Sequence, residues 1–318
     1  MLALAGLGRT FPAQAGWLLM PLLAIGLVGL GVAHGACDQL VLPARRLAGP
    51  GRGYFLKFGA GYLALAVAAG MAWWRWPGMA VGGFFLLTAW HWGSADAPAL
   101  PRYRALWAVH SLLRGALPFA GAARWWPAEA QHSVEGLLAF AGAAPLAAGR
   151  FAAGAASLWP LVVAGHLALW GSYAALRQPR RWRTDMVEAL LLTGLFWALP
   201  PLLALGVYFV FWHSLQHVLR LNHLFGYAAT GKPAGPWAAL KQELGFFTQR
   251  AWPLLLASVA ALAALYAFPG ARPPNSHTWL GPALAATAAV TLPHALLVSL
   301  VMDAPKWQPN RRSPMQNK

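Results

Sequence analysis

The chain is short of charge, of acidic residues and of cysteine. Only 10% of its 318 residues are charged, whereas about a quarter are charged in soluble domains. Eight residues are acidic against 24 that are lysine or arginine, which gives a formal net charge of +16. The one cysteine, Cys37, excludes a disulfide within the chain and leaves the redox compartment undecided. A soluble domain of ordinary composition is therefore excluded.

Sequence motifs of soluble enzymes are missing as well. The chain has no glycine-rich nucleotide loop, no nucleophile elbow and no thiolate metal motif. We expect no cleavable signal peptide, because the first residues carry little charge and the first apolar run is long enough to remain as a membrane span. The chemistry of the chain therefore has to be sought among its histidines and aspartates.

Long apolar runs are what the sequence has in abundance. Hydrophobic residues make up 58% of the chain and the mean hydropathy is +0.49. Uncharged runs of about 20 residues, the length that crosses a bilayer as a helix, recur along the sequence. These features predict an all-α, polytopic integral membrane bundle. We expect one membrane-embedded catalytic domain over residues 1–303 and a polar, disordered cytoplasmic tail over 304–318.

Basic residues between the apolar runs orient the bundle, because lysine and arginine collect in cytoplasmic loops. If segment 132–149 does not cross, the basic loops and the tail from Lys306 share one side; whether it crosses stays open. We therefore expect nine spans, within a range of eight to ten, an outside N-terminus and a multi-pass place in the inner (cytoplasmic) membrane. The positive charge is assigned to these loops and not to nucleic-acid binding. The spans are expected at 16–36, 58–74, 79–97, 104–122, 156–176, 186–199, 202–221, 251–268 and 279–302.

Four histidines on three of these spans are expected at similar depth. His213 and His217 are four residues apart, so they share one helical face in the inner half of the seventh span. His34 and His91 end the first and third spans on their way to the cytoplasmic side. Four imidazoles without thiolates suit iron, copper or zinc. A single-metal site fits better than a two-metal one, which would need several clustered histidine boxes. His294, on the last span, is expected somewhat deeper.

Aspartates follow these histidines closely. A ligating imidazole normally donates its other N–H to an acceptor. Asp38 comes four residues after His34, and Asp96 comes five after His91, beside a Gly-Ser break that we expect to bend it back. Asp303 closes the last span after His294. We therefore expect Asp38 and Asp96 to orient the metal ligands.

Other interpretations compete with a metal site. His213 and His217 could form hydrogen bonds between helices, and the aspartates could be caps or partners of arginines. Intramembrane histidines also serve transporters and channels that relay protons or pass metal ions, although the inverted repeats of such proteins are not seen here. Paired histidines can also hold a haem. The remaining histidines are interpreted as interfacial or hydrogen-bonded: His110, His132, His166, His223 and His277.

Several short motifs, in order, resemble those of the Brp/Blh family of membrane β-carotene 15,15'-dioxygenases. They are His34-Gly-Ala-Cys-Asp38, His91-Trp-Gly-Ser-Ala-Asp96, Phe211-Trp-His-Ser-Leu-Gln-His217 and Leu292-Pro-His294 with Asp303, which together span about residues 30–303.

The resemblance implies an oxidoreductase with non-haem Fe(II). It would split the central double bond of β-carotene, or of a related carotenoid, with O2 and yield retinal. The polyene would enter sideways from the lipid bilayer, and a functional link to a rhodopsin is expected. The implied iron ligands are His34, His91, His213 and His217, and we group Asp38, Asp96 and His294 with the catalytic residues.

Overall fold

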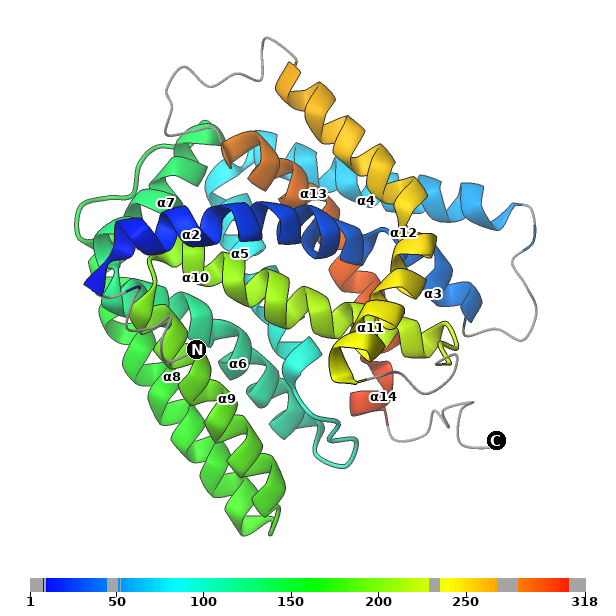
Figure 1. Ribbon diagram of the computed structural model, residues 1–318. Coiled ribbons are helices and arrows are strands. Elements are labelled where there is room, and N and C mark those ends of the chain that lie inside the picture. Colours follow the sequence, from blue (N-terminus) through cyan, green and yellow to red (C-terminus); the bar gives the residue numbers. More distant parts are fainter. Residues whose placement is uncertain are drawn as a thin grey trace.

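The computed structural model describes residues 8, 10–44, 51, 53–228, 235–267 and 280–308. Every regular element in this part of the chain is a helix (Figure 1). The prediction of an all-α bundle is therefore confirmed. Arg45, Arg46, Arg52 and Lys232, which we assigned to cytoplasmic loops, lie outside the described residues.

A helix or a chain of joined helices stands at each of the nine predicted spans. Several of them change their winding along the way from α-helix to π-helix or 3₁₀-helix. The helices are α2 (Pro12–Gly26) with η1 (Leu27–Val32) and η2 (Ala33–Gly35), α4 (Tyr54–Arg75), α5 (Pro77–Asp96), α6 (Arg104–Trp125), α8 (Arg150–Ala175), α9 (Pro179–Ala198), α10 (Pro201–Tyr208) with η3 (Phe209–Ser214) and α11 (Leu215–Leu224), α12 (Pro236–Ala267), and α13 (Leu280–Leu297) with η6 (Val298–Met302). The short α3 (Asp38–Ala44) follows η2.

Five of these helical stretches in the described part are long and apolar enough to cross a bilayer by themselves. The segment that we doubted, 132–149, contains the end of α7 (Pro127–Phe140), whose 14 residues are fewer than the roughly 20 that a crossing needs. This length agrees with the expectation that the segment does not cross. The total of nine crossings stays a prediction. The five stretches are Gly16–Gly35, Tyr54–Arg75, Arg150–Ala175, Pro201–Leu224 and Pro236–Ala264.

Prolines mark the starts of several helices. Pro77, Pro127, Pro179 and Pro201 each stand in the first turn of a helix, where the missing N–H has no helical partner to lose. At the other end of α5, Ala97 is extended because Pro98 follows it. Helix α5 nevertheless runs unbroken to its end, so the expected Gly-Ser break is wrong.

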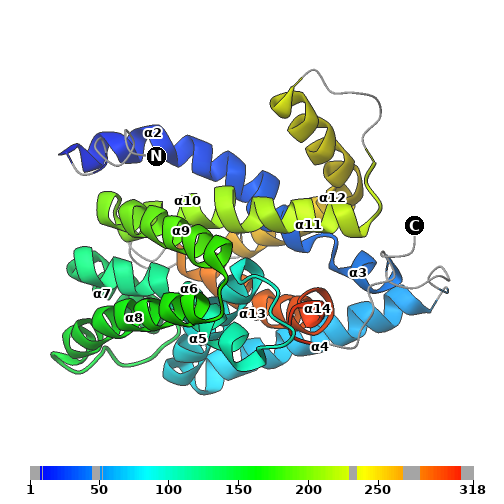
Figure 2. The same cartoon turned by 90° about the horizontal axis from the view of Figure 1, so that it is seen from below.

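Helix α6 is the hub of one half of the molecule. It contacts α5, α7, α8 and α9, which surround it (Figure 2). The crossing with α5 is so close that the backbones touch. A Cβ added at Gly93 would lie 1.7 Å from the carbonyl oxygen of Ser111, and one added at Gly115 would lie 1.7 Å from that of Ala89. Glycine is therefore required on both helices at this crossing.

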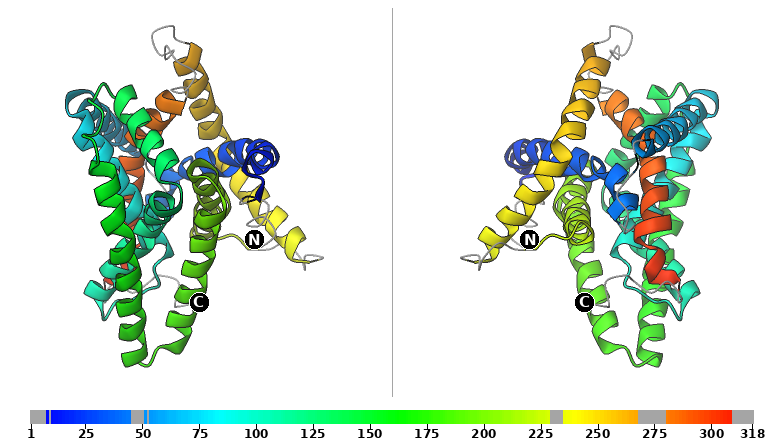
Figure 3. Two further views of the ribbon diagram at one scale, coloured as in Figure 1. Left: turned by 90° about the vertical axis from the view of Figure 1, so that its left-hand side faces the viewer. Right: turned by 90° about the vertical axis from the view of Figure 1, so that its right-hand side faces the viewer.

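The other half is built around α13. This helix packs against α4 and α5, and it also contacts α12 (Figure 3). The continuous α10–η3–α11 helix lies along α2 and η1. Helix α5 contacts both α6 and α13 and so joins the two halves. Five elements meet in the interior between the two halves: η2, α5, η3, α11 and α13.

The outer faces of the described helices are strongly apolar. Trp17 is 85% exposed, Trp74 84% and Trp237 83%, and Leu56 and Ile25 are also mostly exposed. Large side chains of this kind would be costly to expose to water but are at home among lipid chains and at the membrane interface. The protein is a helical membrane protein, as the composition predicted.

The start of the expected tail is ordered, which corrects its predicted boundary. Residues Ala304–Trp307 form a short helix, α14. The Trp307 ring stacks on Trp107 of α6, and the Leu100 amide donates to the carbonyl oxygen of Lys306 at 2.9 Å. These contacts fasten the end of the last span to α6. Residues 309–318 of the expected tail lie outside the described residues.

The glycine crossing gives a test of the fold. We expect Gly93→Ala to destabilise the protein by about 3 kcal/mol or more, because its Cβ meets rigid backbone. The change is measured as the midpoint of thermal unfolding in detergent, with size-exclusion chromatography to quantify the folded protein that remains after heating. Gly82→Ala is the matched control on the same helix, since nothing lies within 4 Å of the added Cβ. Equal unfolding midpoints for the two variants would contradict the close crossing.

Candidate metal centre

Three stretches of π-helix lie beside histidines of the interior. Leu27–Val32 ends two residues before His34, Phe209–Ser214 contains His213, and Val298–Met302 begins four residues after His294. A π-helical turn holds an extra residue and so changes the direction in which the following side chains project. Such turns are rare and occur most often at functional sites. Their coincidence marks this part of the bundle as a candidate site.

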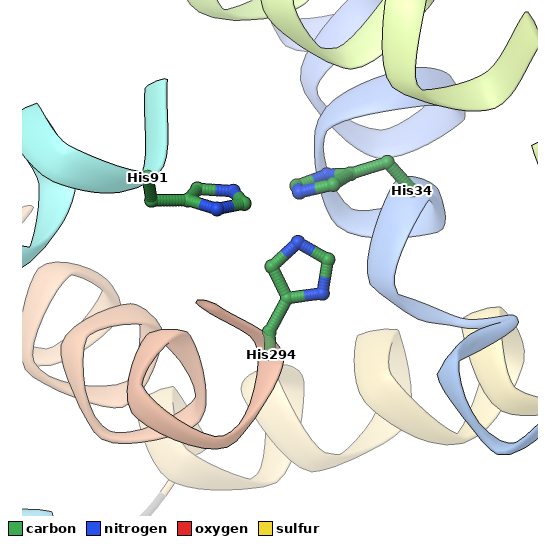
Figure 4. A group of neighbouring side chains, drawn as sticks. All are labelled: His34, His91 and His294. Carbon is green, nitrogen blue, oxygen red and sulfur yellow. The ribbon is translucent and has the colours of Figure 1, made fainter. Parts of the chain in front are cut away.

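Five buried histidines gather at this place, and Figure 4 shows three of them. The predicted four, from η2, α5, η3 and α11, are brought together as expected. The fifth is His294 of α13, whose ring lies 4.8 to 5.2 Å from the rings of His34, His91 and His217. Its greater depth in the membrane stays a prediction. The ring centroids of neighbouring members lie 4.8 to 6.5 Å apart. The five, called here the histidine cluster, are His34, His91, His213, His217 and His294.

The ring nitrogens of the cluster face one another. The Nε2 atoms of His91 and His213 are 3.2 Å apart. Ligand atoms of His34, His91 and His294 all lie within 4.8 Å of one another, and the same holds for Asp38, His217 and His294. Two imidazoles bound at right angles to one divalent metal ion, at about 2.1 Å each, lie about 3 Å apart. The spacing therefore suits ligands of a single ion.

Half of the ten ring nitrogens of the cluster have no protein partner among the described residues. Among the described residues, no hydrogen bond is made by the buried Nδ1 atoms of His91 and His213, by either nitrogen of His217, or by Nε2 of His294. A buried polar atom without a partner costs about 1–3 kcal/mol. So many in one place are explained if a cation binds there. The donor set is all imidazole, so it fits a transition metal such as iron.

Asp38 contacts a different histidine from the one we predicted. Its Oδ2 accepts a hydrogen bond from Nδ1 of His294 at 2.8 Å, and its Oδ1 is 3.0 Å from the same nitrogen. His34 instead directs its Nδ1 to the carbonyl oxygen of Gly31. The expectation that Asp38 orients His34 is therefore wrong. Four-residue spacing did not pair them because the chain leaves the 3₁₀-helix at Gly35.

Asp96 does not orient His91 either. Its Oδ2 accepts hydrogen bonds from the Tyr208 hydroxyl and from Nε1 of Trp212, each at 3.1 Å, and lies 3.5 Å from Nε of Arg114. Because α5 is not bent after His91, Asp96 stays on another face of the helix. It fixes Trp212, the neighbour of His213 in the chain, and so acts on the cluster only through that helix.

Arg114 is a residue that our sequence analysis missed. It is fully buried in α6 and reaches three acidic groups: Glu188 at 2.7 Å, Asp96 at 3.5 Å and Asp185 at 3.7 Å. Its guanidinium also lies 6.0 Å from the ring of Trp212. The signal was present, since a charged residue inside an apolar span usually has a role. Arg114 ties α5 and α9 to α6 beside the cluster.

Asp303 directly follows η6, at the end of the last helical stretch that carries a histidine of the cluster. It accepts hydrogen bonds from the Ser94 hydroxyl at 3.0 Å and from Arg220 at 2.5 Å, and Lys306 lies 3.4 Å away. Burial lowers the pKa of Lys306 to about 8, although Asp303 opposes the shift. Ser94 is one turn after His91 and Arg220 is close to one turn after His217. Through these contacts Asp303 joins α5 and α11 next to the cluster.

The remaining histidines lie outside the cluster. His110 contacts the Tyr173 hydroxyl at 2.6 Å and Asp185 at 2.8 Å, and His166 bonds the Val162 carbonyl oxygen at 2.9 Å. These two are the hydrogen-bonded residues that we expected. His223 and His132 are exposed, whereas His277 is outside the described residues.

Aromatic side chains border the cluster on one side. The Phe209 ring lies 5.5 Å from that of His34 and 6.0 Å from that of His213, and Trp92 lies 5.9 Å from His213. Phe119 stacks on Trp92 in turn. The imidazoles are thus flanked by apolar rings that suit an apolar ligand.

Comparison with known proteins agrees with this site. A family profile described as beta-carotene 15,15'-dioxygenase matches residues 25–302. A protein of Halobacterium salinarum named probable beta-carotene 15,15'-dioxygenase Blh is 31% identical over 293 residues, which cover 88% of this chain and 83% of the relative. No solved structure matches.

The chain belongs to the beta-carotene 15,15'-dioxygenase family. The resemblance seen in the sequence is therefore confirmed, and so is the prediction of an enzyme of the carotenoid-cleaving dioxygenase class. The matched stretch contains all five histidines of the cluster. Family membership also points to a metal cofactor, for which the cluster is the candidate place.

The buried arginine gives a second test. We expect Arg114→Met to destabilise the protein by about 3–5 kcal/mol, because it leaves acidic groups buried without their cation. Thermal unfolding in detergent measures the loss. Arg124→Met is the control, since Arg124 is exposed on the same helix, and a change within about 0.5 kcal/mol is expected. If Arg114→Met unfolds at the wild-type temperature, the acidic groups do not depend on its charge.

Proposed function

We propose that this protein is an iron(II)-dependent, haem-free enzyme that cleaves the central 15,15' double bond of β-carotene with O2 to give two molecules of retinal. The observation that carries the proposal is the cluster of five buried imidazoles, in which five of the ten ring nitrogens have no hydrogen-bond partner among the described residues. Family membership supports the reaction class and the carotenoid substrate. It also favours an enzyme over the transporter or channel that we considered.

The iron ligands proposed first are His34, His91, His213 and His217. They come from three separate helical segments, so the tertiary fold alone brings them together. When bound, iron(II) would supply the oxygen chemistry that protein side chains lack. Imidazole is a neutral ligand, so the site would keep the charge of the metal ion. The two oxygen atoms of O2 are accounted for by the two aldehyde groups of the products.

The protein's own part is to orient nitrogens and to exclude water. Nδ1 of His34 donates a hydrogen bond to the Gly31 carbonyl oxygen, and this leaves the lone pair of Nε2 for the metal. The aromatic rings of Phe209 and Trp92 shield one side of the cluster. Electrostatic interactions strengthen when water is excluded from such a site. These residues thus provide a dry site with fixed nitrogen positions.

Which double bond is cut is a question of placement. β-Carotene is a long apolar molecule dissolved in the bilayer, and all its chain double bonds are chemically similar. Cleavage at the centre therefore requires the protein to hold that bond beside the metal. We propose that the substrate enters sideways from the lipid and that the rings around Trp92 and Phe209 fix its depth.

The cellular setting follows from topology and product. The basic loops favour a multi-pass protein of the inner membrane with its C-terminus in the cytoplasm. On that orientation Asp303 and α14 lie on the cytoplasmic side of the cluster. Retinal is the chromophore of rhodopsins, so we propose that the enzyme supplies retinal to a rhodopsin.

The function is tested in a bacterial host that accumulates β-carotene. We expect the wild type to replace carotene with retinal. In His217→Ala, retinal should fall by at least about 100-fold, since even the outer partners of metal ligands are worth about 10–100-fold. Pigment extraction measures both compounds, and metal analysis of the purified protein should find iron in the wild type and little in the variant.

His223→Ala is the matched control. His223 is an exposed histidine on the same helix as His217, so its removal should leave both retinal and bound iron unchanged. Retained iron with full activity in His217→Ala would remove this residue from the site. Unchanged carotene with wild-type protein confirmed in the membrane would overturn the proposed substrate.

A further inference from the structure

We propose that His294 is a fifth imidazole ligand of the metal, held in place by Asp38 and Tyr62. This inference rests on the metal centre proposed above and extends its ligand set from four histidines to five. It also changes the role of Asp38, which acts on His294 through a hydrogen bond and is therefore a positioning residue.

The position of the His294 ring carries the first part of the argument. Its centroid lies 4.8 Å from that of His34, 4.9 Å from His91 and 5.2 Å from His217. His294 is also the one histidine that belongs to both groups of mutually close ligand atoms in the described part of the chain. Figure 4 shows one of its ring nitrogens pointing toward the rings of His34 and His91, while the other points away from them. This position places His294 among the candidate ligands.

The two nitrogens of His294 have different surroundings. Nδ1 is bound to Asp38, whereas Nε2 is buried and has no hydrogen-bond partner among the described residues. A hydrogen bond at Nδ1 places the proton there and leaves a lone pair on Nε2, which faces the other imidazoles. This is the arrangement of a carboxylate, a histidine and a metal ion that recurs in metalloproteins.

The buried charge of Asp38 is the second argument for His294 as a ligand. The side chain is 2% exposed. The other three aspartates of the chain each have an arginine within 4 Å, whereas the ion-pair contact that the structure describes for Asp38 is to His294 alone. A buried carboxylate needs a cation nearby. A metal ion on the far side of the His294 ring supplies it.

Tyr62 completes the arrangement from α4. Its hydroxyl donates to Oδ2 of Asp38 at 3.0 Å, the same oxygen that accepts from His294. Two donors on one oxygen fix the carboxylate and, through it, the plane of the imidazole. Helix α4 thereby contributes to the centre although it carries none of its histidines.

A charged ion pair is the competing explanation. If His294 were a permanent imidazolium paired with Asp38, its positive charge would repel a metal ion from the cluster. The two explanations predict opposite effects on metal affinity when the imidazole is removed. Loss of a ligand weakens binding, whereas loss of a repelling charge strengthens it.

The experiment measures Co(II) binding to the metal-free protein in detergent, with affinity from titration and geometry from the visible spectrum. We expect His294→Gly to weaken Co(II) binding by at least about 10-fold and to change the spectrum. Added imidazole should restore both, because it can fill the space and bind the ion. Tyr62→Phe should weaken binding less and leave the spectrum nearly unchanged.

His166→Gly is the matched control, since this buried histidine bonds the backbone of its own helix outside the cluster. It should bind Co(II) as the wild type does. If His294→Gly does not fold, His294→Gln keeps much of the volume without an imidazole nitrogen, and the same weakening is expected.

Two results would overturn the inference and leave the proposed function intact. One is wild-type affinity and spectrum in the His294 variants, and the other is tighter binding in them. A wild-type protein that binds neither Co(II) nor iron would instead contradict the metal centre itself. The failures of the two proposals are therefore distinguishable.

Discussion

The structure depends on burying five imidazoles where neither water nor enough protein partners can satisfy them. Each unsatisfied nitrogen costs free energy, and several meet in one small space. The surrounding fold holds this arrangement in place. The π-helical stretches direct the rings inward, and the glycine crossing fixes α5 against α6. Arg114 ties α5 to α9 as well, and Asp303 joins the histidine-bearing helices α5 and α11.

Much of this architecture could be predicted from the sequence. Apolar runs predicted where the helices lie, although α12 begins at Pro236 and not at residue 251. The meeting of His34, His91, His213 and His217 followed from helix order and the positions of basic loops, which set the depth of each residue. The sequence of a membrane protein thus indicates how deep in the bilayer each residue lies. This is why four histidines far apart in the chain could be grouped without a structure.

The depth of a residue does not show on which side of its helix the side chain lies. Asp38 and Asp96 were assigned to the histidines nearest in sequence, but one pairs with His294 and the other with Tyr208 and Trp212. The winding of η1 and η2 and the unbroken end of α5 decide these partners. Tyr62 gave no signal at all, because its partner is 24 residues away on another helix. Arg114 did give one, as a lone charge within an apolar run.

The spread of the cluster along the chain has a consequence for biogenesis. His34 lies on the first span and His294 on the last, so the centre cannot close while the ribosome is still making the final helix. Until then, imidazoles from the earlier helices lack the side that α13 provides. Each newly inserted chain therefore passes through a state in which the cluster is open on the side of α13. Insertion of the last helix is then the step that completes the five histidines.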